Sequence, residues 1–173
     1  MEEILVLGYA RTAIGTFGGS LAGISPIDLG IFVSREAINR SGIDSSQIGN
    51  VTFGHVINTE PRDMYLSRVT AIGAGVPREA PAMNANRLCG SGAQAIVSTF
   101  QSLSMGDAEF GLAGGAENMS RSPHLMSSGR WGQKMGNAQL TDMMIGALTC
   151  PFGTGHMGVT AENVASEYKI SRE

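Results

Sequence analysis

The stretch Asn86-Arg87-Leu88-Cys89-Gly90-Ser91-Gly92 lies where a short extended run, residues 80–85, gives way to a helical pattern, residues 93–104. Amide N–H groups at a helix N-terminus are unpaired, and together with the helix dipole they favour the thiolate, which is the reactive form of cysteine. Small residues follow Cys89 and leave room for a substrate. Cys89 is therefore a candidate nucleophile, but most free cysteines are small buried core residues, and position alone does not decide between the two.

The segments around this stretch alternate between strand and helix patterns. Apolar runs predict four short strands, at residues 4–9, 47–57, 81–84 and 110–113. Helical spacing between them predicts three helices, at residues 26–41, 61–73 and 93–104, the first with Ser25 as N-cap, Pro26 at its first position and Gly42 just past its end. Such alternation is typical of βαβ units in a largely parallel sheet, whose ligands bind beyond the carboxyl ends of the strands. Cys89 follows such an end.

The character of the chain changes after Gly114-Gly115. Residues 116–158 are rich in Ser, Gly, Met and Asn and show weak periodicity. A loop of this length within a compact domain is typically functional or a subdomain. Beyond it, Thr160 is placed to cap a helix over residues 160–168.

Composition limits the possible functions. The 173 residues are 42% hydrophobic and 16% charged, as in a globular protein, and the net charge of −3 gives no general attraction to nucleic acid or to an anionic membrane. The two cysteines form no CxxC pair and no disulfide framework, and the first residues contain no basic region of a signal peptide. No apolar run approaches membrane-spanning length. We therefore expect a cytoplasmic protein.

Four motifs follow successive predicted elements. They are Arg11-Thr12-Ala13-Ile14-Gly15 with Phe17-Gly18-Gly19, Asn86 to Gly92, Ala113-Gly114-Gly115-Ala116-Glu117-Asn118-Met119-Ser120, and His156-Met157-Gly158-Val159-Thr160-Ala161-Glu162-Asn163. In this order they resemble the thiolases, most closely the acetyl-CoA acetyltransferase (acetoacetyl-CoA thiolase) type. Each motif alone is weak, but four in order across the whole chain are specific.

The resemblance implies an α/β fold with α-β-α-β-α layers, built from two similar halves. Residues 1–118 correspond to the N-terminal catalytic half, with a mixed, mostly parallel sheet whose last strand is absent, and residues 119–173 to the start of the loop domain. Thiolases are more than twice this length. Their second half supplies an activating histidine, an Asn-bearing motif and a second catalytic cysteine, none of which we find in this sequence. We expect the chain to be inactive, and unstable or associated, when alone.

The resemblance also implies the chemistry. Thiolases condense two acetyl-CoA to acetoacetyl-CoA and CoA, or run the reverse thiolysis, through a cysteine that matches Cys89 and whose N–H contributes to an oxyanion hole. Positions matching Leu148, His156 and Met157 line the pantetheine and acyl path. Coenzyme A is a substrate or product, and neither a covalently bound cofactor nor a metal is expected. The expected partners are the remainder of a thiolase chain, or a C-terminal partner, and further copies in a tetramer, which residues 127–139 typically support.

Several alternatives remain at this stage. The chain is also compatible with a 3-ketoacyl-CoA thiolase of broader chain length, or with a non-catalytic CoA-binding or scaffold subunit. We interpret Cys150 as a small apolar residue beside Pro151, His55 as structural and His124 as solvated. Residues Arg121, Arg130 and Lys134 make the loop region locally basic, and they suit CoA phosphates, a solvated face or a subunit contact.

Overall fold

The computed structural model describes residues 3–173. The chain forms two compact units, a first that ends at Arg121 and a second from Ser122 to Glu173. The boundary expected between residues 118 and 119 from the family resemblance stays a prediction.

A three-stranded parallel sheet forms the centre of the first unit. Strand β1 (Ile48–Gly54) lies between β2 (Ala82–Ala85) and β3 (Phe110–Gly115). Within β1, Val51 pairs with Ala82 on one side and with Leu112 on the other. The three strands end at the same edge because all run parallel. The predicted α/β fold with a mostly parallel sheet is confirmed, and within residues 3–173 this sheet contains parallel strands only.

The helices of the first unit begin and end close to the predicted positions. Helix α1 (Pro26–Ser41) is capped by the Ser25 hydroxyl, which accepts from the amide of Asp28, and ends at Gly42, whose φ is +75°. The helix predicted over residues 61–73 divides into a 3₁₀ helix, η2 (Pro61–Tyr65), and α2 (Leu66–Gly73). Helix α3 (Ser91–Ser104) follows the Cys89 turn and starts two residues before the predicted start. A short 3₁₀ helix, η1 (Ser45–Gln47), precedes β1, and η3 (Met119–Arg121) follows β3.

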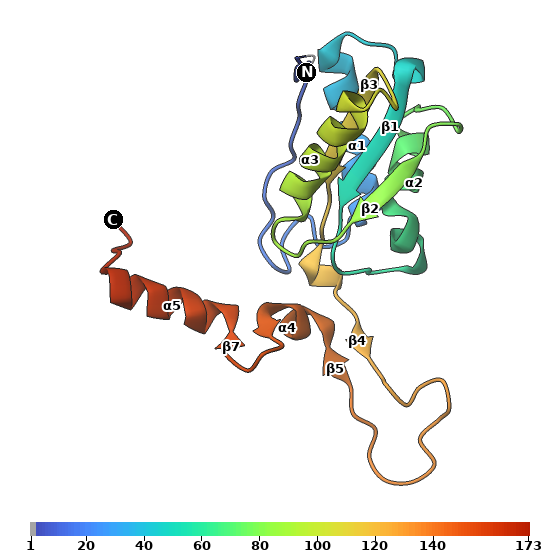
Figure 1. Ribbon diagram of the computed structural model, residues 1–173. Coiled ribbons are helices and arrows are strands. Elements are labelled where there is room, and N and C mark those ends of the chain that lie inside the picture. Colours follow the sequence, from blue (N-terminus) through green and yellow to red (C-terminus); the bar gives the residue numbers. More distant parts are fainter. Residues whose placement is uncertain (1–2) are drawn as a thin grey trace. The chain divides into compact units, whose positions relative to one another are not determined.

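The sheet is covered on both faces (Figure 1). Gly30 of α1 lies against Thr70 of α2 and the ring of Phe53, so these two helices pack together on the Phe53 face. Gly111 of β3 lies against Thr99 of α3 on the opposite face. The first unit is therefore an α/β/α sandwich, as βαβ connections require.

The core lies mainly between the sheet and helices α1 and α2. Its buried cluster consists of Ile27, Ile48, Val51, Phe53, Leu66, Ala71, Val76, Ala80 and Leu112. Phe53 is the largest fully buried side chain, with 1% of its surface exposed. A methyl group built on Gly114, its neighbour on β3, would lie 2.7 Å from the Phe53 ring, so the aromatic ring occupies the space that the glycine leaves.

The prediction of a strand at residues 4–9 is wrong. These residues are extended but pair with no strand in the described part of the chain, and their apolar side chains are largely exposed, Val6 to 82%. The segment packs along α1 instead. Gly8 lies against the backbone of Ala37 and Ser41, and the guanidinium of Arg40 donates to the carbonyl of Tyr9 at 3.2 Å. An apolar run has strand-like spacing but becomes a strand only where a partner edge receives it.

The second unit consists of short elements. It contains β4 (His124–Leu125) paired with β5 (Thr141–Asp142), α4 (Met143–Leu148), the hairpin of β6 (Thr149–Cys150) and β7 (Gly155–His156), and α5 (Met157–Tyr168). No residue from 122 to 173 is buried. The prediction that Thr160 caps the last helix is wrong. Helix α5 starts three residues earlier, because the ring Nδ1 of His156 accepts from the amide of Gly158 at 3.0 Å and acts as the cap.

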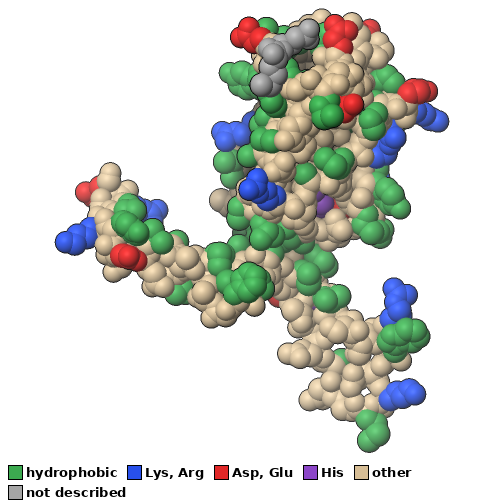
Figure 2. All heavy atoms as spheres, viewed as in Figure 1, with side chains coloured by type: hydrophobic (Ala, Val, Ile, Leu, Met, Phe, Trp, Pro, Cys, Tyr) green, Lys and Arg blue, Asp and Glu red, His purple; other side chains and the backbone are tan. Residues whose placement is uncertain are grey.

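Apolar side chains reach the surface of both units (Figure 2). In the first unit they include Leu5, Val6, Tyr9, Ile14 and Phe17, and in the second Trp131, Met135 and Phe152. Within residues 3–173, no helix has the length and apolar character needed to cross a membrane.

Candidate active site

Cys89 lies in a tight turn at the carboxyl edge of the sheet. Strand β2 ends at Ala85, the turn follows, and α3 begins at Ser91 with Gly90 as its N-cap residue. Cys89 is exposed. Its neighbour Leu88 adopts a left-handed backbone conformation with φ +47°. Leucine rarely occupies this region, because Cβ meets the backbone there, and such residues concentrate at functional sites. The exposed position removes the alternative of a buried core cysteine.

Several amide groups at this turn and at the start of α3 are left without an acceptor. Within residues 3–173, no acceptor is bonded to the amides of Cys89, Gly92 and Ala93. The last two belong to the first turn of α3, where amides have no partner inside the helix. Unpaired amides at the start of a helix can bind an anionic group of a ligand.

Two glycines allow the turn to lie directly on the sheet edge. A methyl group built on Gly54, the last residue of β1, would lie 2.6 Å from the carbonyl carbon of Ser91 and 2.8 Å from the amide nitrogen of Gly92. One built on Gly115, its neighbour on β3, would lie 3.2 Å from the carbonyl oxygen of Gly54. Any larger residue at position 54 therefore displaces the start of α3, and with it the Cys89 turn.

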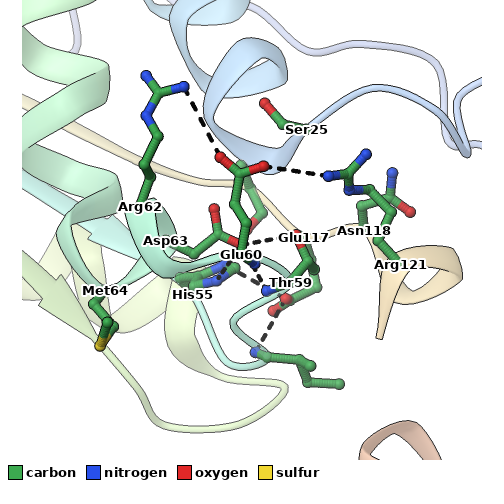
Figure 3. A network of polar contacts seen from close by, with 12 residues as sticks. Ser25, His55, Thr59, Glu60, Arg62, Asp63, Met64, Glu117, Asn118 and Arg121 are labelled. Carbon is green, nitrogen blue, oxygen red and sulfur yellow. Dashed lines mark hydrogen bonds and ion pairs between the residues drawn. The ribbon is translucent and has the colours of Figure 1, made fainter. Parts of the chain in front are cut away.

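A polar cluster follows the same strand ends (Figure 3). The ring Nδ1 of buried His55 lies 2.8 Å from the carbonyl oxygen of Ala116, so this nitrogen carries the hydrogen and donates it. His55 also lies between two carboxylates, with Nδ1 3.4 Å from Glu117 Oε1 and Nε2 3.9 Å from Asp63 Oδ2. The predicted structural role of His55 agrees with its burial. Within residues 3–173, no cluster of His, Cys, Asp or Glu is arranged to hold a metal ion.

The two carboxylates order the loop after β1. Glu117 accepts from the amides of Val56 at 2.9 Å and Ile57 at 3.1 Å. Asp63, fully buried, accepts from the amide and the hydroxyl of Thr59 at 2.7 and 2.8 Å. Charge-assisted bonds of this kind are among the stronger ones in proteins. They fix the path of the chain as it leaves the sheet.

Asn118 and Arg121, both labelled in Figure 3, tie the glycine-rich loop after residue 11 to the same edge. The Asn118 amide donates to the carbonyls of Leu21, Ala22 and Ile24, the shortest at 2.7 Å. Arg121 donates to the carbonyl of Gly23 and forms an ion pair with Glu60 at 3.2 Å. Arg121 therefore has a structural partner within the first unit, rather than the free solvated position considered from the sequence.

Sequence reasoning did not identify Asp63, Glu60 and Thr59 as parts of this cluster. The pattern Thr-Glu-Pro-Arg-Asp over residues 59–63 carries a capping signal, because a carboxylate three positions after a residue can accept from its amide. That signal predicts a helix start, but it does not predict which distant side chains meet there.

The other predicted site residues lie in the second unit. The antiparallel pair β6–β7 joins Thr149 to His156, so Leu148 and Met157, which flank that pair, lie at the open end of the same hairpin. Leu148 and His156 are half-buried, and Met157 is exposed. The structure thus brings these three residues together. Their role in binding a substrate stays a prediction.

Cys150 is the last residue of β6, next to the turn of this hairpin, and is half-buried. Its interpretation as a small apolar residue beside Pro151 stays a prediction. Hydrogen bonds from the Thr154 side chain, and then from the backbone at Thr154 and Phe152, lower the pKa of the Cys150 thiol below its usual range. His124 is exposed, as predicted.

Comparison with known proteins finds a matching family model and several similar proteins. The family model described as "Thiolase, N-terminal domain" matches residues 4–173. The beta-ketothiolase BktB of Cupriavidus necator is 57% identical over 171 residues, which cover 99% of this chain and 43% of the relative. The acetyl-CoA acetyltransferase of the same organism is 43% identical over 174 residues, which cover 100% of this chain and 44% of the relative.

Solved structures agree with this likeness. The human mitochondrial 3-ketoacyl-CoA thiolase in complex with CoA superimposes with a TM-score of 0.91 at 36% identity, over 96% of this chain and 42% of that one. The acetyl-CoA acetyltransferase of Bacillus anthracis gives a TM-score of 0.88 at 35% identity, over 96% and 42%. The chain spans less than half the length of the relatives it matches.

Proposed function

The chain belongs to the thiolase family, and we propose from this premise that it carries the acyl-accepting half of a thiolase active site, with Cys89 as the nucleophile. Thiolysis of acetoacetyl-CoA, and the reverse condensation of two acetyl-CoA, is the reaction that this assignment supports. A cysteine suits acyl exchange because it accepts an acyl group from one thioester and returns it to another at nearly equal free energy.

In thiolysis, the Cys89 thiolate attacks the ketone carbon of acetoacetyl-CoA. The bond between that carbon and the neighbouring methylene carbon breaks, and acetyl-CoA leaves as an enolate that takes up a proton. The acetyl group remains on Cys89 as a thioester. The thiolate of free CoA then attacks this thioester, which yields a second acetyl-CoA and regenerates the Cys89 thiolate, so atoms and charge balance.

One observation supports this proposal above the others. Cys89 is exposed beside its own unbonded amide and the first amides of α3, at the carboxyl edge of a parallel sheet. Preorganised N–H donors at the position of a developing oxyanion are often the largest single contribution to acyl-transfer catalysis. The group that deprotonates Cys89 and the proton donor to the enolate are proposed to come from the remainder of a thiolase subunit, as the family resemblance implies.

The second unit is proposed to bind the CoA moiety. Leu148, His156 and Met157 occupy one end of the β6–β7 hairpin and match the positions that line the pantetheine and acyl path in the family. A solved relative is described as a complex with CoA, which supports CoA as substrate and product. Assembly into a homotetramer and a cytoplasmic location remain proposals.

Acyl trapping tests the nucleophile. We expect the protein, expressed in its own host with any polypeptide that stays bound, to form a covalent acetyl adduct on Cys89 after incubation with radiolabelled acetyl-CoA, as located by peptide mass spectrometry. Cys89→Ser should abolish both the adduct and thiolysis of acetoacetyl-CoA, while Cys150→Ser should retain both. Full thiolysis by Cys89→Ser would disprove the assignment.

A second candidate is a thiolase that accepts longer 3-ketoacyl-CoA substrates. Identity is higher to a beta-ketothiolase, at 57%, than to an acetyl-CoA acetyltransferase of the same organism, at 43%. Values of kcat/KM for acetoacetyl-CoA and 3-ketohexanoyl-CoA distinguish the two specificities. A CoA-binding subunit without catalysis, the third alternative, is excluded if the acetyl adduct forms on Cys89.

A further inference from the structure

We propose that Ser91 is a positioning residue for Cys89, through a hydroxyl that holds the backbone of the turn on both sides of the nucleophile. This inference rests on the proposed role of Cys89. It extends that role to a side chain that does not itself touch the reacting atoms.

The Ser91 hydroxyl bonds to two backbone groups of the turn. It donates to the carbonyl of Leu88 at 2.6 Å and accepts from the amide of Arg87 at 2.9 Å. The amide of Ser91 also donates to the Leu88 carbonyl, at 3.0 Å. Ser91 is buried, with 5% of its surface exposed, so solvent does not compete for these bonds. The hydrogen bonds therefore close residues 87–91 into a ring that includes Cys89.

The other hydrogen bonds in the turn leave one amide without an acceptor there. The amide of Leu88 donates to Asn86 Oδ1 at 3.1 Å, and the amide of Gly90 donates to the carbonyl of Arg87 at 3.0 Å. Together with the two bonds of Ser91, every amide from Arg87 to Ser91 has an acceptor within the turn except that of Cys89. Within these five residues, the amide that remains able to donate to an acyl oxygen is thus that of the residue that would carry the acyl group.

The conformation of Leu88 explains why such a constraint is needed. A left-handed conformation is unfavourable for a leucine, and Leu88 is 57% exposed, so burial contributes little to offset that cost. The Leu88 carbonyl accepts from both the hydroxyl and the amide of Ser91, which stabilises the conformation. Without the hydroxyl, we expect the turn to relax and Cys89 to lose its fixed direction.

The arrangement differs from an ordinary helix cap. A capping serine precedes the helix, and its oxygen accepts from an amide two or three residues further on. Ser91 is instead the first helical residue of α3, and its hydroxyl bonds to residues that precede it. Its bonds therefore order the turn that carries Cys89 more than they order the helix.

Two pairs of variants that differ by one hydroxyl test this proposal. Ser91→Ala is compared with the unmodified protein, and Ser91→Val with the isosteric Ser91→Thr, in the protein as expressed in its own host. We expect kcat for thiolysis, per folded molecule, to fall about 10- to 100-fold in the Ala and Val variants, because small misplacement of a reacting group has effects of that size. KM should stay within about twofold, and Ser91→Thr should recover most of the kcat lost in Ser91→Val.

Ser98→Ala provides the matched control. Ser98 lies on the same helix and accepts from the Gln94 side chain at 3.1 Å, with no bond to the turn. Its kcat and KM should be unchanged. If Ser91→Ala fails to fold, the Thr and Val pair carries the test alone.

The results for the Ser91 variants can be distinguished from the results for Cys89→Ser. Loss of kcat in the variants without a hydroxyl, with KM retained and with rescue by Thr, supports the positioning role. Unchanged kcat in folded Ser91→Ala, or equal loss in the Thr and Val variants, overturns it. Neither result decides whether Cys89 carries the acetyl adduct. Full activity of Cys89→Ser, in contrast, would disprove the nucleophile role on which the proposal for Ser91 rests.

Discussion

The two units of this chain hold their cysteines by different means. Cys89 is exposed, but the turn around it lies on a sheet whose core buries Phe53, Leu66 and Val51. Cys150 belongs to a unit in which no residue from 122 to 173 is buried, and its environment is a hairpin turn with Thr154. The turn of the first thiol is therefore anchored by long-range packing in addition to its local bonds, whereas the pKa of the second thiol is set by neighbours within four residues. Changes to the core should affect the first thiol and not the second.

The largest expected effect comes from the aromatic core of the first unit. Phe53→Ala should lower the free energy of unfolding of this unit by about 3–5 kcal/mol, because a cavity replaces the ring that lies against Gly114. Phe152→Ala should change the free energy of unfolding of the second unit by less than about 0.5 kcal/mol, since Phe152 is 91% exposed. Urea denaturation followed by circular dichroism measures both. Equal effects would contradict the described contrast between the units.

A smaller effect is expected from the contact between the sheet and the start of α3. Gly54→Ala should lower the free energy of unfolding by about 1–3 kcal/mol through overpacking, because its new methyl group meets the backbone of Ser91 and Gly92. The alkylation rate of Cys89 by iodoacetamide should change with it, while that of Cys150 should not.

Gly146→Ala is the matched control for this substitution. Nothing lies within 4 Å of a methyl group at Gly146 in α4, so a gain of about 0.5–1 kcal/mol from helix propensity is expected there. A destabilisation as large as that of Gly54→Ala would show that the open space around Gly146 is occupied.

The smallest effect concerns the pH dependence of the local thiol. Hydrogen bonds from Thr154 lower the pKa of Cys150, so the folded state binds its proton less tightly than the unfolded state does. The resulting stabilisation is present above the pKa of the unfolded thiol and is lost as the pH falls through the lower folded pKa. Iodoacetamide labelling of Cys150 should therefore persist to lower pH than labelling of an unstructured cysteine peptide.

Thr154→Val identifies the cause of this shift. It removes the first of the hydrogen bonds and keeps the side-chain volume, so the labelling profile of Cys150 should move to higher pH, while the profile of Cys89 should stay where it was. An unchanged Cys150 profile would assign the shift to the backbone of the turn instead.

Much of the first unit was predictable because its signals are local. Ser25, Pro26 and Gly42 gave the ends of α1, and the position of Cys89 between an extended run and a helix placed the turn. The strand at residues 4–9 was mispredicted because pairing depends on an available edge, which periodicity does not contain. The start of α5 was misplaced because Thr160 is the more common cap residue, whereas His156 makes the bond.

The site was predictable as a motif but not as a network. The proposal that Cys89 is the nucleophile follows from its position and the family resemblance, while the contacts of His55 with Asp63 and Glu117 join segments far apart in the sequence. No pattern within a short window contains such pairs. The bonds of Ser91 lie within five residues, but their direction depends on the left-handed Leu88, which a sequence rarely reveals for leucine.

The parallel order of the sheet has a consequence for synthesis on the ribosome. Phe53 of β1 pairs with Gly114 of β3, which is translated roughly sixty residues later. At about 5–20 residues per second, β1 therefore waits several seconds with one edge unpaired and its aromatic ring uncovered. During that interval the nascent chain exposes the unpaired edge of β1 and the Phe53 ring, so chaperone binding should be strongest before residue 115 emerges and should decline once β3 pairs with β1.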